Sequence, residues 1–304
     1  MVMKSTLLFL SRQEKLKNFV LRFEFAQKVS RRFVSGETQE QAILAVKDMN
    51  QKGFFATLDR LGENVTNKDE ASKAADDYIM LLDKINQNNV DSNVSCKLTQ
   101  MGLDLDFDFC VNNVKRIVEK AKEHNNFVRI DMEDSPRTDK TLQVCFALHK
   151  DYQNVGAVIQ AYLYRSEEDV RKLLEQKIRI RLCKGAYKES KKVAFQKKKE
   201  VDDNFVKLTK MMLKSGVYHG IATHDDKMIQ ATIDFAKKEN IPKESYEFQF
   251  LYGIRRELQE DLVKKGYNVR IYVPYGDQWY PYFMRRMAER PANLFFVAKN
   301  YFRR

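Results

Sequence analysis

An alternation of short β-like runs with longer amphipathic stretches limits most strongly how this 304-residue chain can fold. Eight runs are rich in β-branched and aromatic residues and are separated by helical patterns. They are FFATLD (54–59), NVSCKL (93–98), FVRIDM (127–132), GAVIQAY (156–162), IRIRLC (178–183), GIATH (220–224), YEFQFL (246–251) and NVRIYV (268–273). Because no Pro/Gly-rich linker interrupts them, they predict one closed α/β barrel, with an open doubly wound sheet as the alternative.

The order of residues within the runs adds a second constraint. In a strand, Ile180 and Leu182 point to one face and Arg181 to the other, and Asp131 likewise opposes Ile130. The apolar faces should meet the helices, so the polar side chains should point into the barrel near the carboxyl ends of the strands. A single buried polar residue is ordinarily a paired structural group. Seven or more polar residues at one rim of the barrel predict a binding site.

A helical arm is expected before the barrel. Residues 4–35 mix apolar residues with Lys and Arg at helical spacing, and Thr38-x-x-Gln41 predicts a capping box that opens a second helix. We expect residues 1–52 to form helices packed on a barrel of residues 53–304, although a basic amphipathic helix also suits an anionic lipid surface. No apolar run near the start is long enough to span a membrane, so we expect a cytoplasmic protein.

Charge and motif content narrow the chemistry. Lys and Arg number 54 against 42 Asp and Glu, a net charge of +12 that suits nucleic acid, an anionic membrane surface or an anionic ligand. The four cysteines have no C-x-x-C spacing, and H-E-x-x-H is absent, so neither a disulfide framework nor a metal site is expected. The chain also lacks G-x-G and the P-loop motif, which argues against both of those nucleotide-binding designs.

The last helical stretch carries a cluster of charge. After a turn at 274–276, Tyr282, Arg285, Arg286 and Glu289 fall within an arc of roughly 100° on one helical face. Adjacent arginines commonly lie on the surface and point apart. The alternative is a fork that binds a carboxylate or phosphate through paired hydrogen bonds.

Six short motifs then occur in order along the predicted barrel. They are VIQAY (158–162), RLCKGAY (181–187), ATH (222–224), EFQFLYG (247–253), IYVPYG (271–276) and YFMRRMAE (282–289). Together they resemble the proline dehydrogenase family, over about Ala56 to Glu289. The resemblance implies a distorted (β/α)8 barrel that binds FAD at its C-terminal mouth, with the last barrel helix above that mouth. It also implies oxidation of L-proline to 1-pyrroline-5-carboxylate, the first step of proline catabolism to glutamate, by hydride transfer to flavin N5.

The resemblance implies a substrate site. Lys97 would bind the proline carboxylate together with Arg285 and Arg286, and Glu63, in the loop after the first strand, would pair with Arg285 as a gate. Four further residues would wall the proline ring. These are Tyr187, Leu251, Tyr272 and Tyr282.

It also implies catalytic and flavin-binding residues. Asp131 and Arg181 match catalytic positions, and Asp131 would hold Lys97 or an arginine in place. Cations such as Arg181 would stabilise the negative charge that hydride transfer leaves on the flavin. The other implied flavin contacts are Met132, Gln160, Lys184, Gly185 and Ala186, with Thr223, His224, Glu247 and Gln249 along the ribityl, phosphate and adenine portion.

The sequence departs from the family pattern at three places. Gln196 stands where relatives usually carry proline, Cys183 replaces an aliphatic residue, and Lys188 follows Tyr187 where bifunctional relatives have tryptophan. These changes concern the flavin's exposure to oxygen, not the reaction type. The chain ends near residue 304, without the aldehyde dehydrogenase or DNA-binding segments of bifunctional relatives, so a separate pyrroline-5-carboxylate dehydrogenase and no nucleic acid are expected as partners. The family passes electrons to membrane quinone, which suits peripheral membrane contact through the basic arm.

Two other functions compete with this interpretation. A flavin enzyme for a related imino acid such as hydroxyproline explains the motifs nearly as well, but Tyr272 favours proline because hydroxyproline enzymes of the family use a smaller residue there. A basic, non-enzymatic binding protein explains the charge but not the inward polar residues. The densest lysine cluster, 197–199, also lacks the interleaved aromatics that stack on bases.

Overall fold

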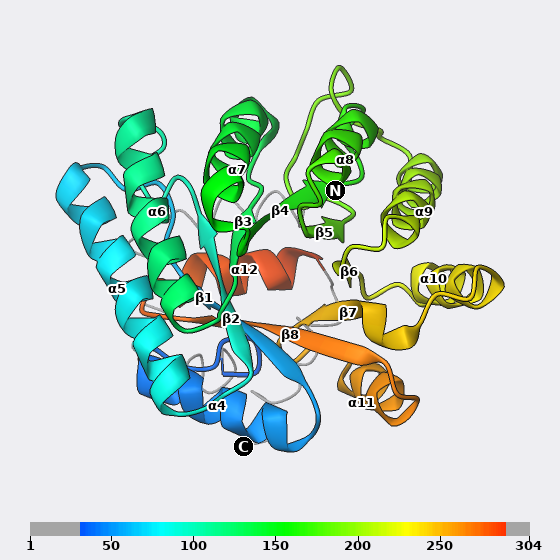
Figure 1. Cartoon of the computed structure of the whole chain (residues 1–304), viewed down its shortest axis with the longest axis horizontal. Coiled ribbons are helices and arrows are strands. Elements are labelled where there is room, and N and C mark those ends of the chain that lie inside the picture. Colours follow the sequence, from blue (N-terminus) through cyan, green and yellow to red (C-terminus); the bar gives the residue numbers. More distant parts are fainter. Residues whose placement is uncertain (1–30, 290–304) are drawn as a thin grey trace.

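Eight parallel strands close into a barrel in sequence order (Figure 1). The computed structural model describes the backbone of residues 31–289 and the side chains of residues 31–284. The strands are β1 (Phe55–Arg60), β2 (Ser92–Lys97), β3 (Val128–Asp131), β4 (Val155–Gln160), β5 (Ile180–Cys183), β6 (His219–Ala222), β7 (Tyr246–Leu251) and β8 (Asn268–Tyr275). Their ends differ from the predicted runs by at most two residues. Pairing of β8 with β1 closes the barrel, so the closed-barrel prediction is confirmed and the open-sheet alternative is wrong.

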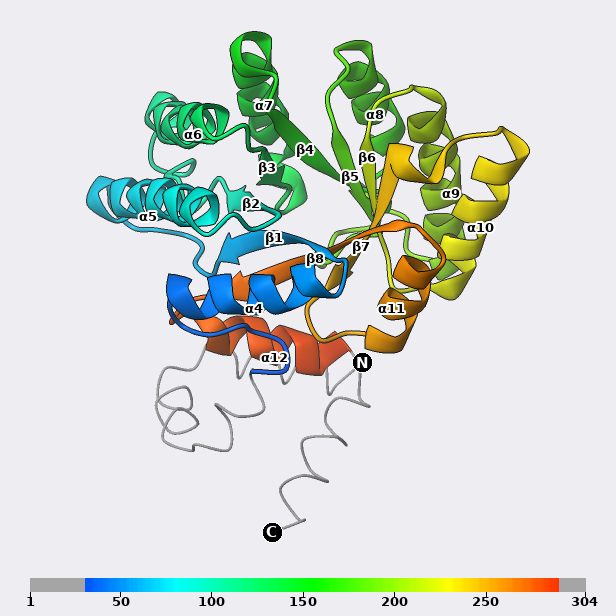
Figure 2. The same cartoon turned by 60° about the horizontal axis from the view of Figure 1, so that its bottom comes forward.

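Helices surround the barrel, and one of them lies across its end. They are α4 (Gln39–Gln51), α5 (Lys68–Gln87), α6 (Phe107–Glu123), α7 (Thr138–Tyr152), α8 (Ser166–Glu175), α9 (Lys198–Lys214), α10 (Asp226–Lys238), α11 (Arg256–Lys264) and α12 (Trp279–Glu289), with the short helices η1 (Ser135–Arg137) and η2 (Lys243–Ser245). In Figures 1 and 2, α12 crosses one end of the barrel, whereas α5 to α11 stand around its outside. Trp279 and Phe283 of α12 pack with Leu61, which directly follows β1, so this end is the C-terminal mouth.

The apolar core lies between the strands and the outer helices. Val94, Ile130 and Leu182 are fully buried and share one apolar cluster with Leu81 of α5 and Val114 of α6. These are the strand positions that the two-residue period assigned to the outer face. The prediction that apolar residues face the helices is therefore confirmed.

The barrel interior holds paired charges in place of a fully apolar filling. Arg270 donates from Nε to both carboxylate oxygens of Glu247, at 2.8 and 2.9 Å, and from Nη1 to the Ala56 carbonyl at 2.6 Å. Although burial opposes its ionisation, Arg270 holds the pKa of Glu247 below its usual value. Because Glu247 is the second residue of β7, this pair fills the barrel near the amino ends of its strands.

The described part of the N-terminal arm packs against the barrel. Thr38 and Gln41 form the predicted capping box, with each backbone N–H donating to the other side chain at 3.3 Å. Ahead of it, Ser35 N donates to the Pro274 carbonyl at the end of β8. Residues 4–30 of the predicted arm lie outside the described residues, and the division at residue 52 stays a prediction. None of the described helices combines the length and apolarity that a membrane span requires.

A buried histidine makes this fold sensitive to acid. His219 Nδ1 accepts a hydrogen bond from Ile180 N at 3.0 Å, and Nε2 lies 3.0 Å from Ser215 Oγ. Burial, reinforced by Arg129 and Arg179, lowers the pKa of His219 to about 3. Because this value lies below that of an unfolded histidine, about 6.5, the neutral ring stabilises the fold above pH 6.5 and that stability is lost as pH falls toward 3.

The substitution His219→Asn should separate the stability that comes from hydrogen bonding by the ring from the stability lost when the ring is protonated. Asparagine keeps an acceptor for Ile180 N but cannot be protonated. At pH 7 we expect a loss of about 1 to 3 kcal/mol in unfolding free energy, from the smaller side chain and the weaker hydrogen bonding. Between pH 6.5 and 4 the variant should lose stability less steeply than the parent, by up to about 1.4 kcal/mol per pH unit. Urea denaturation across this pH range measures the loss at pH 7 and the pH dependence. If the unfolding free energies of variant and parent fell in parallel with pH, the assignment of acid sensitivity to His219 would be contradicted.

Candidate active site

Asp131, at the end of β3, is the centre of a network at the barrel mouth. Its Oδ1 accepts hydrogen bonds from Ser95 Oγ at 2.6 Å and Arg181 Nη1 at 2.8 Å, and its Oδ2 accepts one from the Tyr272 hydroxyl at 2.8 Å. The Arg181 guanidinium also lies over the Tyr272 ring, 5.1 Å from its centre. Four strands thereby hold one carboxylate, one guanidinium and one phenol in a fixed arrangement. The prediction that Asp131 holds an arginine is confirmed for Arg181.

The Arg181 guanidinium retains one unused donor. Its Nε donates to Gln249 Oε1 at 2.6 Å and its Nη1 donates to Ser95 and Asp131. The residue is only 6% exposed, and its Nη2 group is buried without a hydrogen-bond partner among residues 31–284. Leaving a buried charged donor unsatisfied is unfavourable by about 1 to 3 kcal/mol or more. This donor therefore suits an acceptor on a bound molecule, and Gln249 lies behind Arg181 as its support.

Lys97, at the end of β2, is paired with an aspartate that the sequence patterns did not single out. Its Nζ lies 3.1 Å from both carboxylate oxygens of Asp59 in β1. Burial alone would lower the pKa of Lys97, but the charges of Asp59 and Asp131 outweigh burial and raise it, with smaller contributions from Tyr187 and Glu63. Lys97 is therefore a cation at neutral pH. Alternation within FFATLD puts Asp59 on the inward face of the strand, and this pattern could have identified it as a candidate site residue.

The segment after β5 is shaped by its neighbour, the end of β4. Ala186 N donates to Gln160 Oε1 at 3.1 Å, while Gln160 Nε2 donates to the Glu133 carbonyl at 2.8 Å. Gly185 has φ +126°, and a Cβ there would lie 2.5 Å from the Tyr162 ring. Only glycine fits this close approach without strain. The structure thus brings Gln160, Gly185 and Ala186 together, and Met132, which directly follows β3, is buried.

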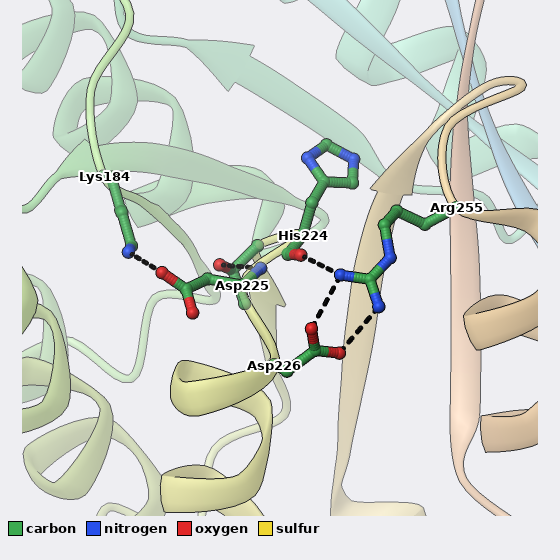
Figure 3. A pocket seen from close by; sticks show the side chains of 6 residues that line it. Lys184, His224, Asp225, Asp226 and Arg255 are labelled. Carbon is green, nitrogen blue, oxygen red and sulfur yellow. Dashed lines mark hydrogen bonds and ion pairs between the residues drawn. The ribbon is translucent and has the colours of Figure 1, made fainter. Parts of the chain in front are cut away.

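A pocket of about 420 Å³ lies beyond the ends of β5, β6 and β7 (Figure 3). Lys184 donates to Asp225 at 2.7 Å, and Arg255 donates to both carboxylate oxygens of Asp226 at 2.7 and 2.8 Å. In Figure 3, Lys184, His224 and Arg255 approach the pocket from three different strand ends. The lining residues are Lys184, Thr223, His224, Asp225, Asp226 and Arg255. Three predicted cofactor contacts therefore share one polar wall, and the pattern analysis missed Arg255.

A second pocket of about 420 Å³ lies between the β1–α5 segment, the end of β2 and α12. Lys97 and Glu63 both line it, together with Pro281 of α12. The side chains of Arg285 and Arg286 lie outside the described residues. Their predicted carboxylate clamp, and the predicted pairing of Glu63 with Arg285, therefore stay predictions.

The remaining predicted residues lie in three different places. Leu251 is half-buried, ends β7 and is in register with Tyr272 of the neighbouring strand β8. Tyr282 is buried within the apolar contact between α12 and Leu61. Glu247 lies elsewhere, because its carboxylate binds Arg270 and the Tyr218 hydroxyl near the amino end of β7. This location supports a structural ion pair and gives no support to the cofactor contact predicted for it.

Comparison with known proteins places this site in a family. A family profile described as proline dehydrogenase matches residues 42–299. Proline dehydrogenase 1 of Bacillus subtilis (strain 168) is 43% identical over 298 residues, covering 98% of both chains, and proline dehydrogenase of Deinococcus radiodurans is 41% identical over 276 residues, covering 89% of both.

A solved structure agrees with these sequences. The crystal structure of proline utilization A (PutA) from Bdellovibrio bacteriovorus, inactivated by N-propargylglycine, superposes with a TM-score of 0.82 at 26% identity. The match covers 87% of this chain and 33% of that one, so this chain spans about a third of the larger protein. The profile, the relatives and the (β/α)8 architecture agree: this chain belongs to the proline dehydrogenase family of oxidoreductases.

Proposed function

We propose that this protein is an FAD-dependent dehydrogenase that oxidises L-proline to 1-pyrroline-5-carboxylate. Its membership of the proline dehydrogenase family supports this reaction. The observation that carries the proposal is the Asp131, Arg181 and Tyr272 network at the barrel mouth. In it, a buried guanidinium keeps one donor that has no partner in the described part of the chain. Such a donor suits a polar ligand held inside that mouth.

The residues at the mouth suit a flavin. Arg181 Nη2 supplies a donor for an acceptor on the ring system, and Gln160 fixes the backbone segment of Gly185 and Ala186 beside it. The pocket lined by Lys184, Thr223 and His224 provides polar groups for the phosphate and ribityl portion. When bound, FAD supplies the two-electron acceptor that takes a hydride at N5.

The chain's own residues bind and orient proline. Lys97, kept charged by Asp59, attracts the proline carboxylate, and Arg285 and Arg286 complete a clamp from α12. A clamped carboxylate fixes the direction in which the ring carbon next to nitrogen faces the cofactor. Tyr187, Leu251, Tyr272 and Tyr282 wall the ring. No strong general base is required if the amine binds deprotonated.

Tyr272 supports proline over hydroxyproline. Its hydroxyl is fixed by Asp131 and its ring is covered by the Arg181 guanidinium, so the side chain cannot turn aside without breaking both contacts. A bulky phenol held in place leaves less room for an added substrate hydroxyl. The same pocket therefore disfavours the related imino acid.

The partners follow from this reaction. We propose quinone as the electron acceptor, a separate pyrroline-5-carboxylate dehydrogenase as the consumer of the product, and a cytoplasmic location. Peripheral contact of the basic N-terminal arm with an anionic membrane surface would bring the reduced flavin near quinone.

The visible spectrum of the purified protein tests cofactor and substrate together. We expect a flavin absorption band that L-proline bleaches under anaerobic conditions, because reduced flavin loses that band. Hydroxyproline at the same concentration should bleach it far more slowly. A colourless protein that cannot be reconstituted with FAD would overturn the proposal.

Substitution of the two α12 arginines tests the clamp. In Arg285→Ala or Arg286→Ala, loss of a charge-assisted hydrogen bond to the carboxylate should raise KM for proline by roughly 10- to 100-fold. The kcat should change much less, because the clamp acts on binding. Arg171→Ala is the matched control, since Arg171 pairs with Glu167 and Glu168 on the outer helix α8. Unchanged kinetics in both α12 variants would exclude the clamp.

A further inference from the structure

The segment between β5 and α9 contains one carboxylate that turns inward. Residues 185–193 are all exposed except Glu189, which is half-buried. Its Oε1 accepts a hydrogen bond from Ser135 N at 2.7 Å, and its Oε2 accepts one from the Ser135 hydroxyl at 2.6 Å. Ser135 begins the short helix η1, just past the end of β3. Glu189 therefore connects two parts of the barrel mouth that are 54 residues apart in sequence.

The geometry at η1 explains why this contact is specific. The residue before η1, Asp134, makes no side-chain capping bond, because its carboxylate binds Arg137 instead. The next position, Pro136, has no backbone N–H to offer. The N–H of Ser135, at the start of η1, therefore needs an acceptor from another part of the chain. The Glu189 carboxylate supplies it. Hydrogen bonds to a carboxylate are roughly twice as strong as those between neutral groups.

Other anchors hold the segment in a different direction. Ala186 N donates to Gln160 at the end of β4. Farther along, Tyr164 N donates to the Val193 carbonyl, and Phe195 N donates to the Tyr162 carbonyl. These contacts all attach the segment to residues 160–164. The Glu189 carboxylate attaches it instead to η1, the short helix that follows β3, the strand that carries Asp131.

Tyr187 lies between these two kinds of anchor. It is two residues before Glu189, and it lies near enough to Lys97 to contribute to the raised pKa of that lysine. With 37% of its surface exposed, Tyr187 is not buried in a core that would fix it. The way in which the backbone on either side is held therefore contributes to where the Tyr187 side chain lies.

We propose that Glu189 is a positioning residue for substrate binding: its two hydrogen bonds to Ser135 hold the 185–193 segment so that Tyr187 closes one side of the proline pocket. The proposal rests on the proposed function, in which Tyr187 walls the proline ring. It assigns to Glu189 no contact with substrate or cofactor.

Three variants test this role. Glu189→Ala removes both acceptors, Ser135→Ala removes only the hydroxyl donor, and Glu189→Gln keeps the shape and one good acceptor. We expect Glu189→Ala to raise KM for proline about tenfold while kcat changes less than about twofold, and Glu189→Gln to recover part of the loss. Because both groups act through one contact, the effect of the double Ala variant should equal that of Glu189→Ala alone.

Limited trypsin digestion of the same proteins gives a measurement that does not depend on activity. Lys188, Lys191 and Lys192 are exposed on this segment, and release of Glu189 should speed cleavage after them about tenfold. Asp104→Asn is the matched control, because Asp104 binds Arg137 of the same η1 helix without contacting the segment. That variant should keep the parent KM and the parent cleavage rate.

The outcomes separate this proposal from the proposed function. Parent-like KM and parent-like cleavage in Glu189→Ala would overturn the positioning role, as would additive effects of Glu189→Ala and Ser135→Ala. If Glu189→Ala folds poorly by thermal melting, Ser135→Ala decides, since it deletes a single hydroxyl. A parent protein that does not oxidise proline would overturn the proposed function and the substrate-binding role together, while the digestion would still show whether Glu189 holds the segment.

Discussion

A charge enclosed in a barrel has little access to water, so it must be paired by a residue from another strand. This constraint organises the interior of the protein. Glu247 pairs with Arg270 near the amino ends of the strands, and Asp131 pairs with Arg181 at the mouth. Removing one partner of such a pair typically destabilises a protein by about 3 to 5 kcal/mol, whereas an apolar replacement of both is often tolerated. Stability alone therefore does not explain these pairs. At the mouth, they hold the paired side chains in fixed orientations.

The two ion pairs at the mouth, Lys97 with Asp59 and Arg181 with Asp131, differ in the hydrogen-bond donors that they leave for a bound molecule. The Lys97 ammonium is bound by both oxygens of Asp59, so it presents a compact positive charge at the end of β2. The Arg181 guanidinium has a planar fork whose outer nitrogen is left over after Gln249, Ser95 and Asp131 are served. A lysine suited to electrostatic attraction, on β2, and an arginine suited to a directed hydrogen bond, on β5, thus lie at the same barrel mouth. A small anionic substrate and a larger planar cofactor would need these two kinds of contact.

Much of this arrangement is predictable from sequence, because strand periodicity alone assigns faces. Alternation in VRID and IRLC placed Asp131 and Arg181 inside, and closure of the barrel brought them together. Periodicity does not reveal which inward residues become partners. The pairing of Lys97 with Asp59, or of Glu247 with Arg270, depends on the stagger between strands, which the alternation of residues does not give. Glu189 was hidden for another reason, since it stands among exposed lysines and its partner lies 54 residues away.

Closure between the first and last strands also has a consequence for biosynthesis. Pairing of β1 with β8 joins Phe55 to Arg270 and Arg60 to Tyr275, and the segment before α4 is bonded to Pro274 and Gly276. A chain emerging from the ribosome must therefore wait through more than 200 residues, at roughly 5 to 20 residues per second, before β1 finds its second neighbour. Until then β1 and the newest strand present open edges, which are templates for aggregation. The last strand to be made thus ends the period in which the nascent protein is most vulnerable.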